Sequence, residues 1–283
     1  MNRPTLCLLT LCTLTIAPRA WSQASSIPSA QAAPAAGSEE QRGRALLDQM
    51  VKALGGDAWL NRRDMQAKGR SASFFHNEAN PYVIEYDYWR RFPGSGQPEA
   101  ERLGFLTDKS MILPGKKIDV VQIWTPTNGY EVTYKGREEL PKDQVEDYER
   151  RKNHSIEAVV NTWLKTPGVM VIAEGTSMVM RRIADKVTVL SPNNDAVTIE
   201  LDANTHLPLR RTFQWRNEQF KDHDEDVEEY DDYHTIQGLP TSFMITRYHN
   251  GEMASQRYFS KVEYNLGVPN DMFDPDHLLA KKK

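Results

Sequence analysis

From Met65 onward, apolar and polar side chains alternate with a period of two residues. Such alternation is typical of strands with one apolar and one solvated face, as in antiparallel sheets. The clearest runs are 82–88, 130–135, 197–201 and 209–215. Asn250-Gly251 between the runs 242–249 and 252–264 is a strong hairpin signal. The pattern predicts a sheet of about ten or eleven strands, without the β-α-β alternation of a parallel sheet.

Two segments have helical spacing instead. The sequence 38–41 fits a capping box, a stripe of apolar residues runs from Leu46 to Leu54, and Gly55-Gly56 ends the pattern. The second segment is highly charged over 142–152 and then apolar at Ile156, Val159, Val160 and Trp163. We expect this helix to dock only through its C-terminal end and to contribute a few kcal/mol, which is small enough to open transiently.

The first 24 residues have the features of a cleaved signal peptide. Arg3 precedes an uncharged apolar stretch over 6–17, and small residues at Ser22 and Ala24 fit a cleavage site. The stretch is short for an uncleaved membrane anchor, and Cys7 and Cys12 each follow Leu, which disfavours lipidation. We therefore predict a periplasmic protein, not integral to the membrane. It comprises a signal peptide (1–24), a flexible linker (25–38), a β domain (39–276) and a basic tail (277–283).

Composition narrows the chemistry further. Removal of residues 1–24 leaves 33 basic against 39 acidic side chains and no cysteine. An acidic chain disfavours nucleic-acid binding, which requires a basic face. Without cysteine the mature chain has neither a thiol nucleophile nor a cysteine metal ligand.

The polar motifs point to no particular catalytic chemistry. The acidic segment 222–234 departs from a calcium-loop pattern at Val227 and Tyr233, and we interpret it as a solvated turn and strand edge. The seven histidines are scattered, so we interpret them as surface residues and predict no metal site. HExxH, GxSxG and phosphate-binding glycine loops are lacking, so we predict a protein that is not an enzyme and uses no cofactor. A secreted hydrolase with paired carboxylates remains an alternative.

Several local sequences, taken in order, resemble one family. They are Ala53-Leu54-Gly55-Gly56, 88–94 (YWRRFPG), 123–130 (IWTPTNGY), 201–211 (LDANTHLPLRR) and 262–273 (VEYNLGVPNDMF). In this order they resemble the periplasmic outer-membrane lipoprotein carrier and sorting (Lol-type) family. The resemblance implies a mainly β fold: a curved, unclosed antiparallel β-barrel whose concave face is covered by helices. Carriers of that family hold helical lids with an Arg just before a Pro; the nearest residue here is Arg91, followed by Phe92 and Pro93.

The aromatic strand faces supply the candidate ligand site. Ten residues are predicted to line a cavity or its mouth: Tyr82, Tyr86, Tyr88, Trp89, Arg91, Tyr130, Tyr134, Trp163, Phe213 and Trp215. The predicted lid is 156–164. The ligand would be hydrophobic, such as a lipid or acyl chain. Two alternatives stay open: these rings pack as ordinary core, or the domain senses or binds another envelope protein without lipid cargo.

Overall fold

The computed structural model describes residues 36–108, 115–217 and 219–280. The predicted signal peptide and most of the predicted linker lie outside these ranges. Within them, no helix has the length and hydropathy that a membrane crossing requires.

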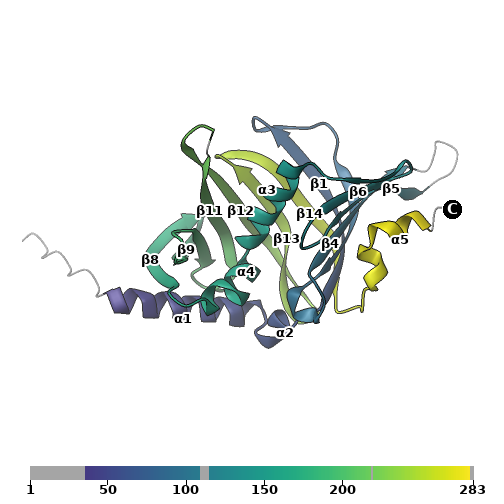
Figure 1. The fold of residues 1–283 in the computed structure, drawn as a ribbon. Helices are drawn as coiled ribbons and strands as arrows, with labels where there is room; N and C mark the ends of the chain where they lie inside the picture. Colours follow the sequence, from purple (N-terminus) through teal and green to yellow (C-terminus); the bar gives the residue numbers. More distant parts are fainter. Residues whose placement is uncertain (1–35, 109–114, 218, 281–283) are drawn as a thin grey trace, which may run out of the picture. The chain divides into compact units, whose positions relative to one another are not determined.

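A single antiparallel sheet of 14 strands forms the described structure (Figure 1). Its strands are β1 (Asp64–Phe75), β2 (Glu78–Ala79), β3 (Ile84–Arg91), β4 (Ala100–Asp108), β5 (Lys116–Trp124), β6 (Gly129–Thr133), β7 (Gly136–Glu139), β8 (Met170–Val179), β9 (Arg182–Leu190), β10 (Ala196–Asp202), β11 (Pro208–Asn217), β12 (Asp222–Ile236), β13 (Leu239–His249) and β14 (Glu252–Tyr264). Their spatial order is β7-β6-β5-β4-β3-β1-β14-β13-β12-β11-β10-β9-β8, and β2 pairs with β1 alone. The predicted fold class is confirmed. The sheet has more strands than predicted because short, polar strands such as β2 and β7 carry little apolar alternation.

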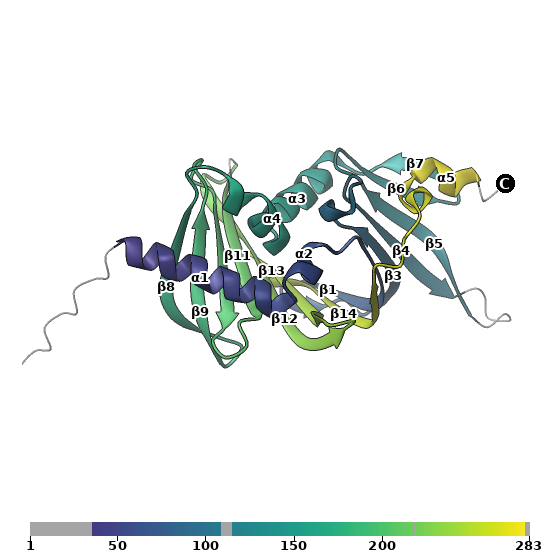
Figure 2. The ribbon, with the colours of Figure 1, turned by 90° about the horizontal axis from the view of Figure 1, so that it is seen from below.

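The order of the strands explains why the helices cover the concave face. The strands β7 and β8 are consecutive in the chain but form the two opposite edges of the sheet. The connection between them must therefore cross the whole sheet. It contains α3 (Lys142–Asn153), α4 (Ile156–Asn161) and the 3-10 helix η2 (Trp163–Lys165), and Figure 2 shows α3 and α4 between the two curled halves of the sheet.

The remaining helices lie outside this connection. The helix α1 (Ala36–Leu54) packs against β8 and β9, and α2 (Asp57–Leu60) follows it after a turn. Gly55 and Gly56 both have positive φ, as the predicted helix end requires. The 3-10 helices η1 (Pro93–Ser95) and η3 (Asn270–Phe273) and the helix α5 (Pro275–Ala280) complete the described chain.

The largest core cluster lies between α1, α4 and the inner face of β8 to β11. Val159, Val171, Val189, Val197 and Ile199 are all fully buried there. Ser155 caps α4 by accepting a hydrogen bond from the Ala158 backbone N–H at 3.1 Å, which separates α4 from α3. Three residues of the predicted apolar stripe, Ile156, Val159 and Val160, are thus buried in α4, whereas Trp163 lies in η2 and is half-buried.

Three polar predictions are wrong. The acidic segment is an internal strand, because β12 pairs with β11 on one side and β13 on the other, and Asp226 is fully buried. The charged helix α3 is also docked: Asp147 pairs with Arg247 at 3.5 Å, and Tyr148 stacks on Trp124 at 4.3 Å between ring centroids. Finally, His154 is buried between the two helices, where Nε2 contacts Asp195 at 2.8 Å and the ring stacks on Phe213.

Candidate functional site

A cleft opens where α2, α3 and α4 face the inner surface of β3, β4 and β12 to β14. It has two chambers with cavity volumes of about 170 Å³ and 200 Å³. The two chambers adjoin, since both are lined by the same six residues: Tyr88, Arg90, Glu157, Tyr230, Ile245 and Arg257.

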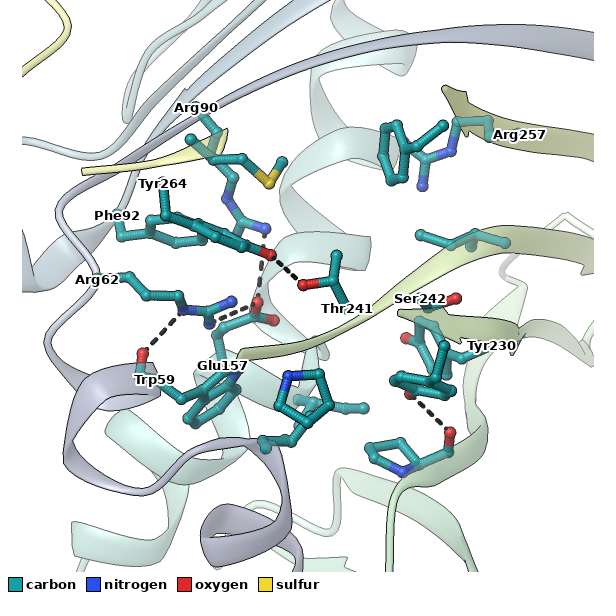
Figure 3. A pocket seen from close by; sticks show the side chains of 18 of the residues that line it. Trp59, Arg62, Arg90, Phe92, Glu157, Tyr230, Thr241, Ser242, Arg257 and Tyr264 are labelled. Atoms are coloured by element: carbon teal, nitrogen blue, oxygen red, sulfur yellow. Dashed lines mark hydrogen bonds and ion pairs between the residues drawn. The ribbon is translucent and has the colours of Figure 1, made fainter. Parts of the chain in front are cut away.

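The first chamber, which we call the apolar chamber, lies nearer to α2 (Figure 3). Its hydrophobic lining comes from α1, α2, β1, α4 and β14: Leu54, Trp59, Met65, Ile156 and Phe259. Ile156 and Trp59 are buried in the surrounding core as well, so this wall is fixed by packing. The chamber can therefore enclose hydrocarbon with little rearrangement of its walls.

Arg62 closes one end of the apolar chamber. Its guanidinium lies 4.6 Å from the Trp59 ring centroid and 4.4 Å from that of Phe92. Its Nε donates to the Trp59 carbonyl at 2.8 Å, and its Nη2 lies 3.4 Å from Glu157 (Figure 3). Burial lowers the pKa of Arg62, while Glu157 counteracts that shift by favouring the charged form. This guanidinium is fully engaged with its own protein.

Glu157 connects the covering helix α4 to the sheet. Besides Arg62, it lies 3.6 Å from Nη1 of Arg90, which also contacts Glu99 at 2.9 Å and Glu101 at 3.4 Å. Burial would raise the pKa of Glu157, but Arg90 and Arg62 outweigh burial and hold the pKa below its ordinary value. Glu157 is therefore a charged contact by which α4 is held over the cleft.

The second chamber, which we call the charged chamber, lies between α3 and the middle of the sheet. Glu228 accepts a hydrogen bond from the Tyr230 hydroxyl at 2.8 Å and lies 3.1 Å from Arg211. Burial raises the pKa of Glu228, but Arg211, Arg257 and the Tyr230 hydrogen bond together lower it to about 2. Glu228 is thus a carboxylate throughout the physiological pH range.

Beneath the charged chamber lies a buried pair of oppositely charged residues. Asp226 contacts Arg211 at 3.2 Å and Arg247 at 2.6 Å, and Asp226 and Arg211 are nearly inaccessible to water. Asp147, on the covering helix α3, contacts Arg247 at 3.5 Å and Arg151 at 3.1 Å. The network spans β11, β12, β13 and α3, so α3 is attached to the sheet by charge as well as by the stacking of Tyr148 on Trp124.

Positive charge exceeds negative charge in the lining of the cleft. The two chambers are lined by five basic residues and three acidic ones: Arg62, Arg90, Arg151, Lys152 and Arg257 against Glu101, Glu157 and Glu228. The chain as a whole has a net charge of −4. Two carboxylates just outside the lining, Glu99 and Asp147, pair with Arg90, Lys152 and Arg151, so the charges in and around the cleft are close to balanced.

The structure distributes the ten predicted ligand residues over several environments. Tyr88 lines both chambers. On the same inner face, Tyr86 is buried edge-on to Phe259, and Phe213 is buried against His154. Trp215 lies beneath the Arg150 guanidinium at 4.5 Å from its ring centroid. These four share a face of the sheet, but Tyr88 is the one that reaches the cleft.

The other six residues lie away from the cleft lining. Trp163 packs beside His154, and Tyr130 lies beneath Arg137. Tyr82 and Tyr134 are 80% and 83% exposed. Trp89 is buried on the convex face beside Phe273, and Arg91 bonds there to the Asn270 side chain. Strand alternation sends Arg91 outward and Arg90 inward, so Arg90 is the arginine of this strand that lines the cleft.

Sequence reasoning missed the inward-facing arginines, although a signal for them exists. Arg90 is two residues from Tyr88 and from Phe92 and therefore lies on the same strand face as they do. Arg257 lies on the same strand face as Phe259 for the same reason. Arg211 likewise lies on the same strand face as Phe213. An arginine in phase with the aromatic residues of a strand therefore marks the inner face, where charge must be compensated.

No group of three or more His, Cys, Asp or Glu in the described part of the chain is arranged to hold a metal ion.

Comparison with known proteins supports the architecture. No protein-family model matches the sequence, and no curated protein matches it. Among solved structures, the chain is similar to a DUF1329 family protein from Desulfovibrio piger, with a TM-score of 0.52 and 10% identity over 85% of this chain and 99% of that one. It is also similar to a putative outer membrane lipoprotein-sorting protein domain from Vibrio parahaemolyticus, with a TM-score of 0.51 and 9% identity over 86% and 99%. The predicted resemblance to the lipoprotein-sorting fold is confirmed, and at these identities the likeness concerns the fold alone.

Proposed function

We propose that this protein is a periplasmic binding protein for a lipid or a lipid-linked acyl chain, which it holds in the cleft beneath α3 and α4. The main support is the combination of a hydrophobic chamber with an adjoining charged one. A hydrocarbon chain gains about 0.8 kcal/mol for each CH₂ group that it buries. Binding of this kind needs a walled apolar space and no catalytic group.

The size of the chambers limits what the cleft holds without movement. Each chamber is smaller than the roughly 300–1,000 Å³ of typical ligand pockets. A lipid with one hydrocarbon chain fits this space better than a two-chain lipid does. A larger ligand requires the covering helices to move away from the sheet. Movement of α3, which has no fully buried residue, costs less than movement of α4, whose Ile156, Val159 and Val160 lie in the packed core.

Native mass spectrometry of protein purified from the periplasm tests the proposal. We expect a bound lipid that survives purification, and uptake of a fluorescent fatty acid after the lipid is removed. Ile245→Trp fills the wall common to both chambers and should abolish uptake. Ile183→Trp places the same bulk at a position that is 59% exposed and should leave uptake unchanged.

Two results would contradict the proposal. One is a protein that never carries lipid and takes up no fatty acid. The other is equal uptake by wild type and Ile245→Trp, which would locate the ligand elsewhere. Stable co-purification of an envelope protein, without lipid, would favour the interaction module instead.

A further inference from the structure

Arg257 has the longest ion-pair contact of the arginines that line the cleft. Its one ion pair within the described ranges is a 3.8 Å contact with Glu228. That carboxylate is already engaged by Arg211 at 3.1 Å and by the Tyr230 hydroxyl at 2.8 Å. By contrast, Arg90 lies within 3.6 Å of three separate carboxylates.

Arg257 also remains accessible to a ligand. Its side chain is 40% exposed, whereas those of Arg90 and Arg211 are 16% and 1% exposed. It lines both chambers, and Figure 3 shows it apart from Arg62 and Arg90. A guanidinium that faces open space with only a shared, distant counterion has donor groups left for a further acceptor.

Arg257 lies where the two chambers meet. An amphiphile bound in the cleft would place its hydrocarbon on one side of Arg257 and its polar end against it. Phe259 lies two residues further along β14 and lines the apolar chamber. Arg151 and Lys152, from α3, line the charged chamber on the opposite side. A ligand with its hydrocarbon against Phe259 would bring its polar end to Arg257.

We infer that Arg257 binds the anionic oxygen group, carboxylate or phosphate, of an amphiphile whose hydrocarbon chain occupies the apolar chamber. This inference rests on the proposed function and adds the charge of the ligand to it. Planar guanidinium donors match both oxyanions in two-point geometry, and hydrogen bonds to charged groups are stronger than neutral ones. Bound there, the anion would give Arg257 a nearer counterion than Glu228, which lies 3.8 Å away.

The test compares probes that share one hydrocarbon chain and differ in the head group. Dodecanoate, dodecyl phosphate, dodecanol and dodecyltrimethylammonium are titrated into delipidated protein, and binding is followed by calorimetry. Wild type should bind the two anions more tightly than the alcohol and bind the cation most weakly. Whichever anion binds more tightly identifies the head group as carboxylate or phosphate.

Variants isolate the contribution of the guanidinium. Arg257→Gln should weaken binding of the anions by about ten- to a hundredfold and leave that of the alcohol unchanged. Arg257→Lys should recover part of the loss because it keeps the charge. Arg70→Gln is the matched control, since Arg70 lies on the neighbouring strand, is 67% exposed and has a similarly long contact of 3.5 Å with Glu85. Thermal unfolding of each variant verifies that it is folded.

The outcomes separate the inference from the proposed function. If wild type binds none of the probes, the proposed function fails. If wild type binds the alcohol as tightly as the anions, or Arg257→Gln weakens all probes equally, the proposed function stands and the inference is overturned. If Arg70→Gln reproduces the loss seen in Arg257→Gln, the effect is general electrostatics and the inference is likewise overturned.

Discussion

Two regions of the same concave face are filled in opposite ways. Under α1 and α4, the inner face of β8 to β10 carries aliphatic side chains such as Val187, Val197 and Ile199, all fully buried. Under α3, the inner face of β11 to β14 carries Arg211, Asp226, Glu228 and Arg257. Because burial of charges costs about as much as their attraction returns, the second region adds little net stability. The difference indicates that the aliphatic region contributes more of the net folding stability than the charged region does.

The strongest test of the difference between the two regions is the removal of one partner from the buried charge network. Asp226→Ala leaves Arg211 buried and in excess, so we expect it to lower the free energy of unfolding by about 3–5 kcal/mol. Urea denaturation measures the loss. Glu263→Ala, which breaks the half-exposed pair with Lys261, should cost at most about 1 kcal/mol. Equal losses would show that the buried network is not special.

A second test compares one substitution in the two regions. Ile199→Ala opens a void in the aliphatic core and should cost about 2–5 kcal/mol of unfolding free energy. Ile245→Ala borders the existing cleft, where water already reaches, and should cost under about 2 kcal/mol. Denaturant melts of both variants give the two values. A larger loss at Ile245 would mean that the cleft is packed as tightly as the core.

Acid should weaken the charged region. The pKa of Glu228 is lowered from 4.5 to about 2 in the folded protein, and that of Glu157 is also lowered. A depressed folded pKa means that these carboxylates stabilise the fold fully above pH 4.5, and that this contribution is lost as pH falls toward 2. The groups facing Glu228 are Arg211, Arg257, Tyr230 and Arg151.

The measurement for this prediction is the free energy of unfolding as a function of pH. It should decline between about pH 4.5 and pH 2 in wild type. Glu228→Gln should be less stable at neutral pH and show a shallower decline. A wild-type profile that is flat through this range would contradict the assignment of Glu228 as a buried, compensated carboxylate.

The smallest expected effect concerns the helix α4, which covers the cleft. Glu157→Gln weakens the contacts of α4 with Arg62 and Arg90, so we expect the helix to open more readily, by about 1–3 kcal/mol in local opening free energy. Hydrogen exchange of the amides in 156–161 measures this opening. Glu146→Gln alters an exposed pair within α3 and should leave these amides unchanged. Unaltered exchange in Glu157→Gln would show that apolar packing alone holds α4.

The sequence predicted the fold better than the site, for a physical reason. Period-two alternation and the Gly55-Gly56 helix end are local signals, and both appear in the structure as expected. The ion pairs of the inward-facing arginines join different elements: Arg90 contacts Glu157 of α4, Arg211 contacts Asp226 of the paired strand β12, and Arg257 contacts Glu228 across β13. Such pairing depends on the strand order, which alternation does not reveal. For the same reason the acidic run 222–234 looked solvated: its counterions, Arg211 and Arg247, come from neighbouring strands.

The crossing of the chain from β7 to β8 has a mechanical consequence. The segment that carries α3 and α4 is joined at its two ends to β7 and β8, the edge strands on opposite sides of the sheet. Flattening of the sheet increases the distance that this segment must span, and tighter curling of the sheet decreases that distance. We therefore expect bending of the strands and lifting of the helices to be coupled, so that spreading of the two sheet edges changes the width of the cleft.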